Sequence, residues 1–127
     1  EEEEDEEESD KKPAEFRPPH HPHGRNLSIY YCNRAACSLH LDRPEESVSD
    51  CDVAVLLNKS YAKAYLRRMA AYERMDKTEE ALRDAKTALF YEPNNANARR
   101  NAKRLEKIEE ERMEKLKEET MGKLKDL

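Results

Sequence analysis

Two basic residues of the sequence, Lys63 and Arg67, stand four positions apart. In an α-helix that spacing places both side chains on one face, so an ammonium and a guanidinium would lie together. A guanidinium fits a carboxylate through two parallel hydrogen bonds, and an ammonium adds a compact charge. The pair therefore predicts a binding site for carboxylate groups. We expect both side chains to be exposed, so that replacing either one would leave the helicity unchanged.

An internal repeat links a third residue to this pair. Asn33 precedes Arg67 by one period of 34 residues (67 − 34 = 33). The same offset relates eight further pairs of like residues: Tyr31/Tyr65, Arg34/Arg68, Ala36/Ala70, Asp42/Asp76, Glu45/Glu79, Glu46/Glu80, Asp50/Asp84 and Ala54/Ala88. Equivalent positions of stacked repeats point the same way, so Asn33, Lys63 and Arg67 are predicted to line one concave surface.

A period of 34 residues with two helices per unit is typical of the tetratricopeptide repeat, and the chain resembles that family. The second unit carries the large and small packing residues of the family: Tyr65, Met69, Tyr72, Ala81, Ala85, Ala88 and Pro93. The first unit keeps Tyr31, Ala35 and Ala54 but has serine or cysteine at other packing positions. The resemblance implies an all-α solenoid fragment with repeats at 28–61 and 62–95 and a capping, then projecting, helix at 96–127.

The segments CNRAA (32–36) and AKAYLR (62–67) are similar to carboxylate-clamp tetratricopeptide domains, and other stretches resemble a small cytosolic adaptor of the family. Clamp domains bind the terminal Glu-Glu-Val-Asp of heat-shock chaperones of 70 and 90 kDa. The resemblance implies that Asn33, Lys63 and Arg67 contact the carboxylates of the terminal aspartate. The family also takes a lysine and an asparagine from an earlier repeat, which this sequence does not supply, so the clamp is incomplete as written.

Helices are expected at 28–41, 45–58, 62–75, 79–92 and 96–126. Ser60, Thr78 and either Asn94 or Asn95 are expected to cap the last three. The final helix has a thin apolar stripe without a clean heptad, so only its first turns are expected to pack on the repeats. Arg34 and Arg68 are interpreted as structural partners within the repeats rather than as ligand contacts.

The segment 1–27 differs sharply from the remainder. Residues 1–10 carry nine carboxylates and no base, so the net charge of −5 leaves +4 for the rest (−5 + 9 = +4). Prolines and histidines follow, and such a segment is predicted to be disordered. The acidic run would either compete with an acidic ligand for the basic groove or only solvate the chain. Without a preceding repeat, one face of the helix at 28–41 would stay exposed. That face would be open to self-association, and the missing interface would lower the stability of the chain.

Composition and motifs argue against other classes of protein. Charged residues make up 42% of the chain and there are two glycines, which disfavours a β-sheet protein. No glycine-rich phosphate loop, HExxH or activated nucleophile is found, so we expect no enzyme, cofactor or metal site. The histidines at 20, 21 and 23 are interpreted as a polar tract. Three cysteines without metal spacing suit a buried role in the cytoplasm, and no apolar run is long enough to span a membrane.

Two alternatives to a chaperone-tail adaptor remain open. The chain could be a scaffold that holds another client, such as a signalling GTPase, through its convex face or C-terminal helix. It could also bind nucleic acid through 99–125, although acids alternate with bases there, and we expect no such binding.

Overall fold

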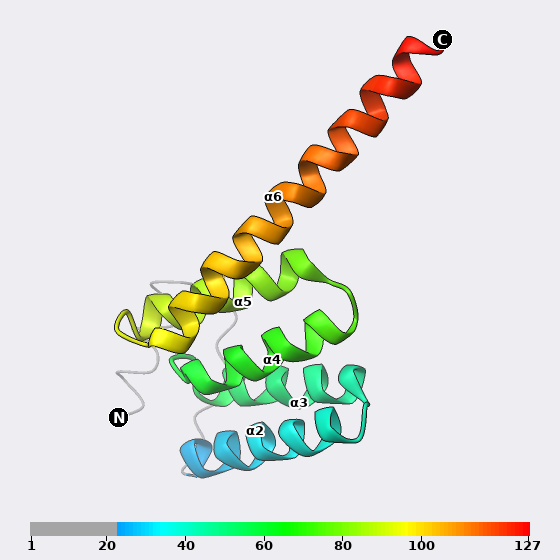
Figure 1. The fold of residues 1–127 in the computed structure, drawn as a ribbon. Helices are drawn as coiled ribbons and strands as arrows, with labels where there is room; N and C mark the ends of the chain where they lie inside the picture. Colours follow the sequence, from blue (N-terminus) through cyan, green and yellow to red (C-terminus); the bar gives the residue numbers. More distant parts are fainter. Residues whose placement is uncertain (1–22) are drawn as a thin grey trace, which may run out of the picture.

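The computed structural model describes residues 23–127. Within these residues the chain forms five helices and no strand, as predicted for an all-α protein (Figure 1). The helices are α2 (Gly24–His40), α3 (Pro44–Leu57), α4 (Ala62–Arg74), α5 (Thr78–Tyr91) and α6 (Ala96–Lys125). They stack as successive antiparallel pairs, and α6 leaves the stack at one end.

Helix α2 begins at Gly24, four residues before the expected start, so residues 24–27 are helical rather than disordered. No proline lies between positions 23 and 43, so the backbone hydrogen bonds can run without a break. Gly24 and Ser28 are both buried, and the Ser28 hydroxyl donates to the Arg25 carbonyl at 2.7 Å. The acidic run and most of the proline- and histidine-rich segment lie outside the described residues.

The first helix of each repeat ends in the same way. Asp42 and Asp76 adopt left-handed backbone conformations with φ of 58° and 59°. The next amide N–H then turns back to the last helical turn, from Arg43 to the Ser38 carbonyl and from Lys77 to the Tyr72 carbonyl, each at 2.9 Å. This closure satisfies carbonyls that the helix end leaves unpaired and directs the chain back along its own repeat.

Repeated ion pairs join the two helices of each repeat. The Arg34 guanidinium donates to both carboxylate oxygens of Asp50 at 2.9 and 2.7 Å, and Arg68 does the same to Asp84. Each guanidinium also lies over a tyrosine ring, Tyr31 at 5.2 Å and Tyr65 at 5.5 Å. The interpretation of both arginines as structural partners is therefore confirmed.

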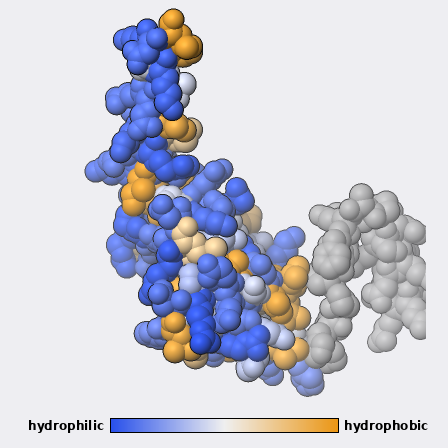
Figure 2. Space-filling view, turned by 90° about the vertical axis from the view of Figure 1, so that its right-hand side faces the viewer, coloured by the Kyte–Doolittle hydropathy of each residue, from blue (hydrophilic) through white to orange (hydrophobic). Residues whose placement is uncertain are grey.

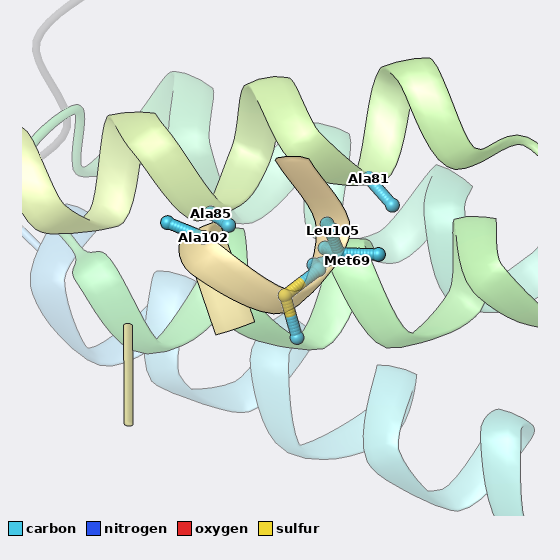
Figure 3. Packing of buried hydrophobic residues seen from close by; sticks show 5 residues of the cluster. All are labelled: Met69, Ala81, Ala85, Ala102 and Leu105. Atoms are coloured by element: carbon cyan, nitrogen blue, oxygen red, sulfur yellow. The ribbon is translucent and has the colours of Figure 1, made fainter. Parts of the chain in front are cut away.

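The core is richer in the second repeat than in the first. Met69 from α4, Ala81 and Ala85 from α5, and Ala102 and Leu105 from α6 pack together (Figure 3). The small alanines let the helices approach closely while Leu105 fills the space between them. The first repeat instead buries small residues: Ser28, Cys32, Ala35, Ser47, Cys51 and Ala54. It therefore gains less from apolar burial.

Helix α6 has 30 residues and at about 1.5 Å per residue reaches about 45 Å. The Asn95 side chain caps it by accepting from the Ala98 amide at 3.0 Å, as predicted. The caps expected from Ser60 and Thr78 are wrong, because Tyr61 and Lys77 occupy those positions and make no side-chain cap bond. Beyond residue 109 the helix is exposed and projects from the stack (Figure 1). Of the described helices, none is both apolar and long enough to span a membrane.

Candidate carboxylate-binding groove

The structure brings Asn33 of α2 and Arg67 of α4 into direct contact. Arg67 Nη1 donates to Asn33 Oδ1 at 3.1 Å and to the Cys32 carbonyl at 2.7 Å. The predicted convergence of these two side chains is therefore observed. Arg67 is half-buried rather than exposed, because it crosses from its own repeat to the backbone of the preceding one. The expectation that the Arg67 side chain is exposed is wrong.

The bond to Arg67 also orients Asn33. Because the Asn33 oxygen accepts from the arginine, its NH₂ group faces away from that bond, and within residues 23–127 no other hydrogen bond holds it. The Arg67 bonds are made through Nη1, so Nη2 and Nε keep their donors. The unused N–H donors of Asn33 and of Arg67 therefore lie beside each other.

Lys63 lies one turn before Arg67 on α4 and is exposed. In the described part of the chain its ammonium makes no ion pair, in contrast to the guanidinium of Arg68 on the same helix. A solvated ammonium at the edge of a groove adds positive charge without fixed geometry. Lys63 therefore shares the α4 face with Arg67 but is not joined to Asn33.

Sequence reasoning missed Arg74. Its Nη1 donates to the Leu39 carbonyl at 3.1 Å and to Asp42 Oδ1 at 3.3 Å. Arg67 and Arg74 are two helical turns apart, and each reaches an α2 carbonyl 35 residues earlier. Ala36, Leu39 and His40 line a shallow hollow of about 180 Å³ between the two arginines. The groove thus has basic edges and a partly apolar floor.

Arg68 and Asp84, next to the groove helix face, neutralise each other as an ion pair. Burial by itself would lower the pKa of Arg68, but hydrogen bonds and attraction to Asp84 and Asp52 raise that pKa above its usual value. Burial raises the pKa of the Asp84 carboxyl, against the effect of its hydrogen bonds from Arg68. The geometry, two short hydrogen bonds to one guanidinium, is that of an ionised pair. No cluster of three His, Cys, Asp or Glu suited to a metal ion occurs in the described residues.

Comparisons with known proteins relate this arrangement to solved domains. No protein-family model matches the chain. The structure titled "First TPR of Spaghetti (RPAP3) bound to HSP90 peptide SRMEEVD" superposes with a TM-score of 0.61 at 38% identity, over 64% of each chain. The second TPR domain of human RPAP3, solved in complex with the HSP70 peptide SGPTIEEVD, gives a TM-score of 0.59 at 35% identity, over 62% of this chain and 66% of that one. This chain belongs to the tetratricopeptide repeat family.

A curated tetratricopeptide relative gives the same result at the level of sequence. The DnaJ homolog subfamily C member 7 homolog of Schizosaccharomyces pombe is 42% identical over 76 residues, which is 60% of this chain. The chain spans 16% of that relative's length. For this tetratricopeptide chain, the roles of Asn33, Lys63 and Arg67 as ligand contacts stay predictions.

Proposed function

We propose that the chain is a protein–protein interaction adaptor rather than an enzyme, and that it acts as a co-chaperone. Its ligand would be the acidic Glu-Glu-Val-Asp type of tail of the 70 and 90 kDa heat-shock chaperones. The observation that carries the proposal is the Arg67–Asn33 bond, which leaves N–H donors from both side chains together. Two similar solved domains are described as bound to peptides ending in EEVD, which supports this choice of ligand.

In the proposed complex the terminal carboxylate accepts from the unused N–H groups of Arg67 and from the Asn33 amide. Lys63 supplies charge to the second carboxylate of the terminal aspartate. Hydrogen bonds to charged groups contribute about 1.5–3 kcal/mol. Because Lys63 and Asn33 are exposed, affinity should fall as salt screens the charges. Three unbridged cysteines suit an adaptor of the cytoplasm.

The test compares a Met-Glu-Glu-Val-Asp peptide with a free C-terminal carboxylate and the same peptide as its C-terminal amide, by isothermal titration calorimetry. The free acid should bind more tightly by about tenfold or more, the equivalent of one charge-assisted hydrogen bond. Lys63→Glu should abolish binding of the free acid, and Lys86→Glu, an exposed lysine on α5 outside the groove, serves as the matched control. Equal affinity for acid and amide would refute the clamp.

The scaffold alternative, which would bind another client such as a signalling GTPase by the convex face or α6, does not need Lys63. Client binding that survives Lys63→Glu while tail binding is lost would assign that client to a different surface.

A further inference from the structure

The apolar face by which α6 packs on the repeats continues along its projecting part. Two series of apolar residues recur every 11 positions: Ala102, Met113 and Leu124; and Leu105, Leu116 and Leu127. The third position of the face changes from Ala98 to Glu109 and Thr120. A period of 11 corresponds to about 3.67 residues per turn, so the stripe stays close to one face of the helix. Its first members, Ala98, Ala102 and Leu105, are buried, whereas Met113, Leu116 and Leu124 are 52%, 50% and 57% exposed.

Two adjoining hollows follow this stripe. The first, of about 790 Å³, lies where α6 leaves α5, with Leu82 and Met113 as its apolar residues. The other residues of its lining are Lys117 and four glutamates: Glu106, Glu109, Glu110 and Glu114, of which Glu109 pairs with Arg112. The second hollow runs on through Met113, Leu116 and Met121. Figure 2 shows hydrophobic residues at intervals along the otherwise hydrophilic projecting helix. The surface therefore suits an apolar helix that carries basic residues at its edge.

The chain itself contains such a helix. Along one edge of the stripe the charges change from acidic to basic, with glutamates at 106, 110 and 114 and lysines at 117 and 125. In a parallel pair this edge would lie against the opposite edge of the partner helix, so its glutamates and lysines would not meet. An antiparallel copy places the lysines of each helix beside the glutamates of the other, as opposite charges at coiled-coil edges select orientation.

We infer that α6 pairs antiparallel with α6 of a second copy of this chain, about a two-fold axis near Leu116. In this register Glu106 faces Lys125 and Glu114 faces Lys117. On the other edge Arg112, which pairs with Glu109 of its own helix, lies opposite Glu119 of the second copy. Each contact occurs twice and the pairing closes on itself. The stretch 106–125 is about 30 Å long at 1.5 Å per residue. Leu124 of each copy enters the acid-rimmed hollow beside Leu82 of the other.

Charge reversal in two matched variants tests the pairing. Glu106→Lys/Glu114→Lys makes the edge wholly basic apart from Glu110, and Lys117→Glu/Lys125→Glu makes it wholly acidic. The four altered side chains are exposed, so helicity should be unchanged. Sedimentation velocity of the unaltered chain should show a monomer–dimer equilibrium between micromolar and millimolar concentration. Each variant alone should dimerise more weakly by about tenfold or more, and an equimolar mixture should regain the dimer mass.

Several outcomes would overturn the inference. These are a monomer at every concentration, variants that dimerise as well as the unaltered chain, or a mixture that stays monomeric. Ile29→Asp separates this surface from the exposed face of α2, where Ile29 is 40% exposed. The inferred dimer survives that substitution and is lost with Leu116→Asp. A dimer that is lost with Ile29→Asp and survives Leu116→Asp would assign self-association to α2.

Discussion

Arg67 has a structural role as well as a place in the groove. Its guanidinium donates to a backbone carbonyl and a side chain of α2, whereas Lys63 on the same helix face is solvated. The two basic residues of the candidate clamp therefore differ in what their removal does to the folded state.

We expect Arg67→Ala to lower the free energy of unfolding by about 1 kcal/mol, the usual value of a hydrogen bond. Lys63→Ala should change it by less than about 0.5 kcal/mol, as for most surface substitutions. Urea unfolding followed by circular dichroism measures both. Equal stabilities of the two variants would contradict the cross-repeat role of Arg67.

The cysteines should differ in reactivity. Cys37 is exposed, while Cys32 and Cys51 are buried. Burial, and next the neighbouring Cys32, raises the pKa of Cys51 to about 12. The raised pKa keeps this thiol protonated in the folded state. The stability that its protonated form contributes is lost only as the pH rises toward that value.

Near neutral pH, an alkylating reagent should therefore modify Cys37 quickly and the other two cysteines only as the chain unfolds. Mass spectrometry of the labelled chain counts the modified thiols with time. A Cys37→Ser variant that still shows one rapid modification would contradict the assignment.

At this scale the sequence predicted part of the groove. Asn33 and Arg67 could be placed together because the 34-residue period relates them, and Lys63 because it stands four positions before Arg67 in one helix. Arg74 could not be found in the same way, because its partner on α2 is a backbone carbonyl, which leaves no mark in the sequence.

At the scale of the helices, the residues that end the first helix of each repeat can be tested by substitution. Asp76 holds a left-handed conformation, with φ of 59°, that glycine adopts without steric cost. Asp76→Gly should raise the free energy of unfolding by up to about 1 kcal/mol. Asp42→Gly should gain less, because it also removes the ion pair with Arg74. Thermal unfolding of both variants measures these changes. An unfolding midpoint for Asp76→Gly below that of the unaltered chain would disprove the expectation.

The two repeated ion pairs have the same geometry but different surroundings. The Arg68 side chain is 19% exposed and that of Arg34 is 51% exposed, although each donates to its aspartate at 2.9 and 2.7 Å. Removing one partner of a buried pair leaves an uncompensated charge.

Asp84→Ala should accordingly cost about 3 kcal/mol of stability, the lower end for a broken buried pair, since Asp52 still contacts Arg68. Asp50→Ala should cost less, because water can solvate Arg34. Guanidinium chloride unfolding of the two single variants tests this order, and equal losses would show that burial does not set the strength of the pairs.

The helices were largely predictable because apolar spacing, Pro44 and the repeat period all agree. The start of α2 was not, because Gly24 and Ser28 are small buried residues that do not register as an apolar pattern. Ser60 and Thr78 have the chemistry of caps, but the tight turns place Tyr61 and Lys77 at the capping positions instead.

For the whole molecule, the helices make most of their contacts with sequence neighbours, so stability is distributed repeat by repeat. The cluster of the first repeat is built on Cys32 and alanines, whereas that of the second includes Met69 and Leu105. Amide hydrogen exchange should therefore be faster in α2 and α3 than in α4 and α5. Exchange measured by mass spectrometry on peptides from each helix tests this, and uniform protection would contradict it.

The bond from Arg67 to the backbone of α2 links occupancy of the groove to the docking of that helix. A ligand that fixes the Arg67 guanidinium favours the state in which α2 is docked on α4, so binding should raise the local free energy of opening. By reciprocity, apparent affinity is reduced by the fraction of molecules in which α2 has detached. A higher temperature, or any substitution that loosens the first repeat, would then weaken binding without altering a single contact residue. A neighbouring structure that stabilises α2 would act as a positive effector of the groove.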